Sequence, residues 1–83
     1  MTNEQIEKFV GVKQRKNNPL NIHFKDRGTV TGLFIQGSDY GELKSKNLWR
    51  IVSNTKLEEW NLTKDMNLSR IFNGISFTRL SED

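Results

Sequence analysis

LNIHFKDRGTVTGLFI, residues 20–35, is the stretch that decides the fold. Apolar and polar residues alternate from Leu20 to Phe24, which is the period of a strand with one buried face. Residues 26–28, Asp-Arg-Gly, are typical of a tight turn. Residues 29–36 are rich in the β-branched and aromatic residues that favour strands. The stretch therefore predicts two strands joined by a short polar turn.

The second of these strands is apolar on both faces. Val30 and Phe34 share a face with Gly32, whereas Leu33 and Ile35 belong to the other face. Such a strand is buried on both sides or bends sharply around a barrel. Gly32 is well placed for that bend or for a close approach of neighbouring backbone. We therefore expect no large side chain to be tolerated there.

Two later segments also have strand character. Residues 48–52, LWRIV, predict a third strand. Residues 68–72 and 75–80 flank Asn73-Gly74, which is the strongest short signal for a two-residue hairpin, because both positions of a type I′ turn need φ > 0. The facing residues in that hairpin would be Phe72 with Ile75, and Arg70 with Phe77.

Helical signals lie at the amino terminus and between the strands. Residues 2–5, TNEQ, fit a capping box and predict a helix over residues 3–10 that ends at Gly11. A second capping-box pattern, residues 55–58, predicts one or two helical turns over residues 56–62. Residues 13–19 read as a basic linker and residues 37–41 as a loop.

These elements predict a mainly β protein with one domain, residues 1–83. The expected architecture is a small, strongly bent antiparallel β-barrel of about five strands (residues 20–80) with an amino-terminal helix (residues 1–12) and a short helical insert. The residues that we expect to be mostly core are Phe24, Val30, Phe34, Ile51, Ile71 and Phe72.

Composition narrows the classes of protein that remain. The 83 residues contain no cysteine, which excludes disulfides and thiolate metal sites. No apolar run is long enough to span a membrane, and we expect a cytoplasmic protein. Residues 1–50 hold nine Lys/Arg against five Asp/Glu, whereas residues 51–83 hold four against five. The basic amino-terminal portion favours an acidic partner such as nucleic acid, with ordinary surface charge as the alternative.

Two motifs resemble those of a known family. Residues 23–32, HFKDRGTVTG, resemble the first motif of the Sm-like (Hfq-like) family, and residues 71–75, IFNGI, resemble its second motif. The resemblance covers the core strands, and broader SH3-like barrels share such turns. It implies a small barrel that binds RNA and that can close rings through its edge strands. The loop over residues 36–43 departs from the family's base-contacting pattern, because Asp39 comes late, and Asn73 stands where many members have Arg.

Little in the sequence points to catalysis. His23 is the single histidine, and no cysteine, serine or acid lies at a telling distance from it. A solvated or hydrogen-bonded histidine is therefore preferred to a general base. Glu58 and Glu59 are adjacent and diverge on a helix, and no phosphate-binding glycine loop or metal-ligand spacing is present. We expect no enzyme activity, no metal and no cofactor.

The sequence contains more residues that favour a binding function. Lys44, Lys46 and Arg50 surround Trp49, and Tyr40 precedes them; cations that neutralise phosphates and rings that stack on bases suit single-stranded RNA or DNA. The alternatives are that Trp49 belongs to the core and that the lysines protect a sheet edge. The resemblance adds Asn73. The predicted nucleic-acid-binding residues are thus Tyr40, Lys44, Lys46, Trp49, Arg50 and Asn73.

A protein-interaction or assembly module is the competing prediction. The edge of the terminal hairpin, residues 70–80, would pair with a partner strand, and Trp60 on the helical insert would serve as an anchor. The alternative for Trp60 is that it covers an open end of the barrel. Arg70 and Arg79, which share a face with Phe72 and Phe77 in the expected hairpin, would form a second contact site or simply extend their charged ends into water.

Overall fold

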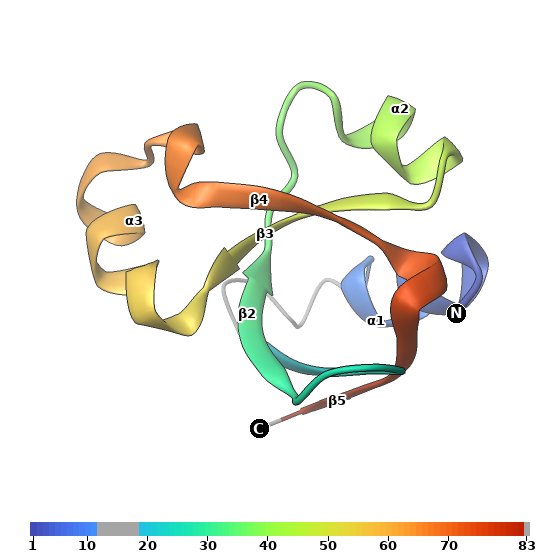
Figure 1. Cartoon of the computed structure of the whole chain (residues 1–83). Coiled ribbons are helices and arrows are strands. Elements are labelled where there is room, and N and C mark those ends of the chain that lie inside the picture. The colour runs from blue at the N-terminus through green and yellow to red at the C-terminus, as the bar shows by residue number, and fades with distance from the viewer. Residues whose placement is uncertain (12–18, 83) are drawn as a thin grey trace.

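A computed structural model describes residues 1–11 and 19–82 of the chain (Figure 1). Most of the predicted linker over residues 13–19 lies outside the described residues. The helices and strands are α1 (Asn3–Val10), β1 (Leu20–Phe24), β2 (Val30–Phe34), α2 (Tyr40–Ser45), β3 (Leu48–Ser53), α3 (Leu57–Thr63), β4 (Ser69–Asn73) and β5 (Phe77–Glu82). Short 3₁₀ turns are η2 (Asn54–Lys56), η3 (Met66–Leu68) and η4 (Gly74–Ser76). Among the described residues, no helix is long and apolar enough to cross a membrane.

The five strands form one antiparallel sheet in the order β4-β3-β2-β1-β5. Figure 1 shows how strongly this sheet curves, with β4 above and β1 and β5 below. Strands β4 and β5 are neighbours in sequence but lie at opposite edges of the sheet, joined by η4. The prediction of a small antiparallel β domain with an amino-terminal helix and a helical insert is confirmed. No strand pairing among the described residues closes the sheet into a barrel.

The predicted terminal hairpin is wrong. Asn73 has φ −87°, its side chain accepts the Ile75 N–H at 3.0 Å, and the chain continues into η4 rather than into a type I′ turn. Phe72 is paired with Trp49 of β3, and Phe77 with Phe24 of β1. The distant pairing wins because it buries Phe77 and Leu80 against β1, which a local hairpin with β4 would not do.

The concave side of the sheet holds the main core. Phe24 and Ile51 are buried as predicted, and Val30, Phe34 and Phe72 are half-buried against the same cluster. The prediction for Ile71 is wrong, since this side chain is 48% exposed. The buried members of this core are Ile6, Leu20, Ile22, Phe24, Trp49, Ile51, Phe77 and Leu80.

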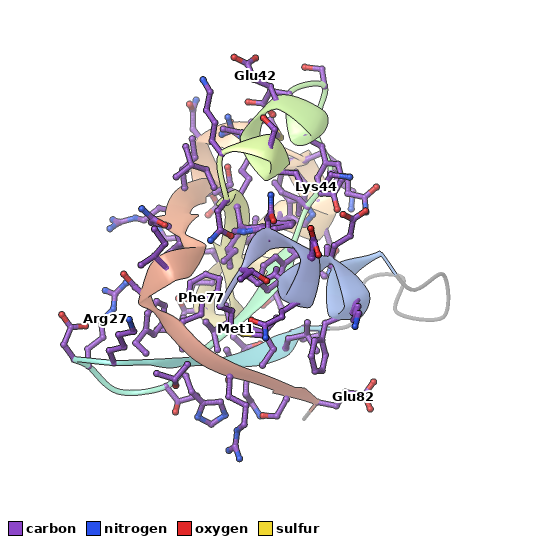
Figure 2. The ribbon with its side chains drawn as sticks, turned by 90° about the vertical axis from the view of Figure 1, so that its right-hand side faces the viewer. Met1, Arg27, Glu42, Lys44, Phe77 and Glu82 are labelled. Carbon is purple, nitrogen blue, oxygen red and sulfur yellow. The ribbon has the colours of Figure 1, made fainter. Side chains whose placement is uncertain are left out.

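Helix α1 covers one end of this core with Ile6. Its capping box is confirmed, because the Thr2 hydroxyl accepts the Gln5 N–H at 3.2 Å and the Gln5 side chain accepts the Thr2 N–H at 3.0 Å. The Met1 amino group donates to the carbonyls of Gly74 and Phe77, at 3.0 and 2.7 Å. In Figure 2, Met1 and Phe77 accordingly lie close together beside α1.

The convex side holds a second apolar cluster, which explains why β2 is apolar on both faces. Leu33 and Ile35 pack there with Val52 and Trp60, under α3. Trp60 is only 8% exposed, so the prediction of an exposed Trp60 anchor is wrong and the covering role is preferred. Helix α3 starts after η2 without a side-chain cap, so the predicted capping box at residues 55–58 is also wrong.

Gly32 of β2 lies beside Ile51 of the main core and Val52 of the second cluster, which are adjacent residues of β3. A Cβ atom there would come within 2.6 Å of Ile51 Cγ2 and 3.0 Å of the Val52 carbonyl oxygen. The predicted close approach at this glycine is therefore confirmed. The predicted loop over residues 37–41 is shorter than expected, because α2 already begins at Tyr40.

Candidate nucleic-acid interface

A groove of about 340 Å³ opens where β4 passes the end of β1. Its position follows from the topology: β4 is an edge strand, and η4 carries the chain from β4 across to β5, next to β1. Figure 2 shows Arg27 on the connection between β1 and β2, at one end of the curved sheet. The lining residues are Phe24, Arg27, Arg70, Ile71, Phe72, Asn73 and Ser76.

Arg27 lies across two aromatic rings in this groove. Its guanidinium carbon is 4.3 Å from the ring centroid of Phe24 and 5.4 Å from that of Phe72. The two rings are 5.9 Å apart and tilted by 43°. This contact limits the freedom of a long side chain at an exposed position and holds the positive charge at the rim. Because Arg27 is exposed, the side of its guanidinium that faces away from the rings can meet a flat group of a ligand.

Arg70 and Asn73 supply further hydrogen-bond donors. Arg70 is exposed, and no carboxylate in the described part of the chain lies within ion-pairing distance of it or of Arg27. The Asn73 side-chain oxygen is occupied by the Ile75 N–H, which leaves its amide N–H₂ as a donor. Since arginine only donates, the groove favours a ligand that is rich in acceptors and negatively charged.

The other predicted site residues lie elsewhere, and their charges are paired. Lys44 forms an ion pair with Glu7 at 2.9 Å, and the hydrogen bond from Lys44 to Glu7 raises the pKa of the Lys44 ammonium. Lys46 pairs with Glu42 at 3.5 Å. Burial raises the pKa of the Tyr40 phenol, and the carboxylate of Glu7 adds to the shift. The α2 region is thus close to neutral rather than a free cationic surface.

Arg50 and Trp49 are both committed to the fold. The Arg50 guanidinium donates to Asp39 at 2.7 Å and to Ser69 at 3.3 Å, and its hydrogen bond lowers the pKa of the Asp39 carboxyl. Trp49 is 2% exposed, and its indole N–H donates to Asn47 Oδ1 at 2.8 Å. The core alternative for Trp49 is confirmed, and its ring is not accessible for stacking on a base.

Of the six predicted residues, only Asn73 lines the groove. The arginines that accompany it are Arg70, which the sequence placed beside Phe72, and Arg27, which the sequence assigned only to a turn. The local signal at Arg27 was an arginine three residues after an aromatic strand end. That signal indicates a site only once β4 places Phe72 beside Phe24 and Arg27. This is a long-range contact, and no local sequence pattern predicts it.

His23 lies on the opposite face of β1 and is hydrogen-bonded. Its Nε2 is 3.1 Å from Ser81 Oγ, and its Nδ1 is 3.1 Å from Thr29 Oγ1. His23 is therefore a hydrogen-bonded histidine with polar side chains beside both ring nitrogens, and not an isolated one. Within residues 1–11 and 19–82, no three His, Cys, Asp or Glu side chains gather closely enough to hold a metal ion.

Comparison with known proteins gives no relative for this chain: no family model, no curated protein and no solved structure matches it.

Proposed function

We propose that this protein is a non-enzymatic module that binds single-stranded nucleic acid in the groove between β4 and the end of β1. One observation carries the proposal: two arginines that pair with no carboxylate of the described residues flank aromatic rings in the same groove. Cations that neutralise phosphates beside flat groups that stack on bases are the combination that single-stranded nucleic acid requires.

The parts of the groove have separate roles in this proposal. A base stacks on the outward face of the Arg27 guanidinium, whose inner face rests on Phe24 and Phe72. Arg70 contacts a phosphate, because it is exposed and forms no ion pair with the carboxylates that the structure describes. The Asn73 amide N–H₂ donates to an acceptor on the edge of the base. RNA is the favoured ligand, in line with the Sm-like resemblance.

We also infer that the sheet forms an SH3-like or Sm-like barrel that is closed by side chains at the β4–β5 junction. The aromatic rings support this inference. Phe24 is 5.9 Å from Phe72 of β4 and 5.3 Å from Phe77 of β5, so these rings link the two edge strands across the end of β1. A groove at such a junction exposes polar groups without opening the core.

Titration of labelled single-stranded RNA and DNA at two salt concentrations tests the proposed function. Affinity should fall steeply with salt, because each phosphate contact releases counterions. Arg70→Gln should weaken binding and lower the salt dependence, and Arg27→Gln should weaken binding further through lost stacking. Lys46→Gln is the matched control, since Lys46 is exposed but paired with Glu42 on α2. Absence of binding at low salt, or equal losses in the control, would contradict the proposal.

A second candidate function is a protein-interaction module. Ile71 and Ile75 are 48% and 60% exposed next to the edge strand β4. An extended partner segment could pair with this edge and cover both isoleucines. Binding of that kind depends little on salt. A protein that remains monomeric at high concentration, with affinity for nucleic acid that falls with salt, would favour the groove over assembly.

A further inference from the structure

A second group of polar side chains lies on the outer face of β1 and β5, behind the groove. His23 and Arg79 face each other across these two strands. The residues that follow them in sequence, Phe24 and Leu80, point into the core. Each strand therefore turns an apolar face inward and a polar face outward. Thr29, which directly precedes β2, and Ser81 complete the group.

Both ring nitrogens of His23 have polar partners in this group, and the direction of each hydrogen bond depends on the tautomer. The Ser81 hydroxyl lies 3.1 Å from His23 Nε2, and Arg79 Nη2 lies 3.3 Å from the same nitrogen. Since arginine can only donate, the tautomer in which Nε2 accepts is the one that binds Arg79. In that tautomer Nδ1 carries the proton and donates to the Thr29 hydroxyl oxygen at 3.1 Å. This tautomer leaves the Thr29 O–H free to donate outward. The imidazole thus holds Arg79 and Thr29 in place from either side.

The donors that remain match a phosphate. Arg79 uses one N–H on His23, and no carboxylate in the described part of the chain pairs with it. The rest of its guanidinium fork is exposed to solvent and suits two oxygens of a tetrahedral anion. Thr29 adds a neutral donor beside it. The uncharged acceptor Nε2 of His23 orients the fork without neutralising its charge.

We infer that Arg79, His23 and Thr29 form a phosphate-binding site, and that a nucleic-acid strand held in the groove places a neighbouring phosphodiester there. The second half of this inference rests on the proposed function. Residues 25–29 support it, because they connect β1 to β2 and carry Arg27 on the groove side and Thr29 on the polar face. His23 and Phe24 are adjacent but belong to opposite faces. A strand that crosses this connection would contact both sites in succession.

Inorganic phosphate is the first probe. Its binding is monitored by NMR through the side-chain resonances of His23 and Arg79 and the amide resonance of Thr29. These signals should shift together in the wild-type protein. In Arg79→Gln, affinity for phosphate should fall about tenfold, as expected for a lost charge-assisted pair. Arg70→Gln is the matched control and should retain the shifts. Unshifted His23, Arg79 and Thr29 signals would overturn the site.

Single-stranded RNA is the second probe and separates a strand from a free phosphate ion. Arg79→Gln should reduce the slope of log affinity against log salt by about 0.7, the value for one phosphate contact on a single strand. An unchanged slope in Arg79→Gln with a reduced slope in Arg70→Gln would overturn the strand path and leave the proposed function intact. The reverse pattern would overturn the groove as the nucleic-acid site and leave the phosphate site intact.

Discussion

Asn47 accepts the indole N–H of Trp49 and also joins the amino terminus to the start of η4. Its Oδ1 accepts the Trp49 indole N–H at 2.8 Å, and its Nδ2 donates to the Met1 carbonyl at 2.9 Å. Its own backbone carbonyl accepts the Gly74 N–H at 2.8 Å, at the junction of β4 and η4. Asn47 has φ 58°, a left-handed conformation that asparagine tolerates better than most residues. One residue therefore satisfies a buried indole and fixes the turn that separates β4 from β5.

The first prediction concerns Asn47. In Asn47→Ala the buried indole N–H loses its acceptor and a less tolerant residue adopts φ > 0, so the free energy of unfolding should fall by about 2–4 kcal/mol. Asn47→Gly removes the same side-chain hydrogen bonds but relieves the backbone, and it should be about 1 kcal/mol more stable than Asn47→Ala. Urea unfolding followed by Trp fluorescence measures both values. Losses below 0.5 kcal/mol in both variants would refute the role of Asn47.

The second prediction concerns Gly32. Gly32→Ala places a methyl group against Ile51 Cγ2 and the Val52 carbonyl, and this overpacking should cost about 1–3 kcal/mol. Gly41→Ala is the matched control, because a Cβ at Gly41 meets nothing within 4 Å and the residue lies in α2. The control should be unchanged or more stable by up to about 1 kcal/mol. Equal effects of the two substitutions would argue against close packing at Gly32.

The third prediction compares two apolar side chains of α3. Trp60 is buried against the convex face of the sheet, whereas Leu62 is 81% exposed. Trp60→Ala should reduce the free energy of unfolding by about 3–5 kcal/mol, enough to unfold much of so small a domain. Leu62→Ala should change it by less than about 0.5 kcal/mol. A stable, fully folded Trp60→Ala protein in far-UV circular dichroism would restore the partner-facing interpretation of this residue.

Local patterns predicted the strands, but not which strands pair. The alternation in β1, the apolar character of β2 and the capping box at Thr2 are each encoded within a few residues, and each agrees with the structure. Asn73-Gly74 misled because the same dipeptide also begins a 3₁₀ turn when its asparagine accepts the Ile75 N–H. The choice between the two is made by burial of Phe77 and Leu80 against β1, which a short window cannot contain.

The candidate site was harder to predict than the fold, because charge partners are long-range. Lys44 lies 37 residues from Glu7 in sequence, yet the two form an ion pair. Arg50 and Asp39 are likewise joined only once α2 folds back beside β3. Conversely, Arg27 and Arg70 have no acidic partner within residues 1–11 and 19–82, a property that can be recognised only after the other ion pairs are known.

The last prediction is a pH dependence at the pair of Asp39 and Arg50. The hydrogen bond from Arg50 lowers the pKa of Asp39 in the folded protein, whereas in the unfolded chain Asp39 titrates near its usual value of about 4. The pair therefore stabilises the fold at pH values above about 4, and this contribution is lost as the pH falls below that value through the lowered pKa. NMR titration of the Asp39 carboxyl should show its pKa moving up toward the usual value in Arg50→Gln. Asp39→Asn should remove the corresponding part of the acid-dependent loss of stability. Glu42→Gln serves as the control, because Glu42 is exposed and pairs with Lys46 at the C-terminal end of α2. An Asp39 pKa that is the same in the wild type and in Arg50→Gln would contradict the prediction.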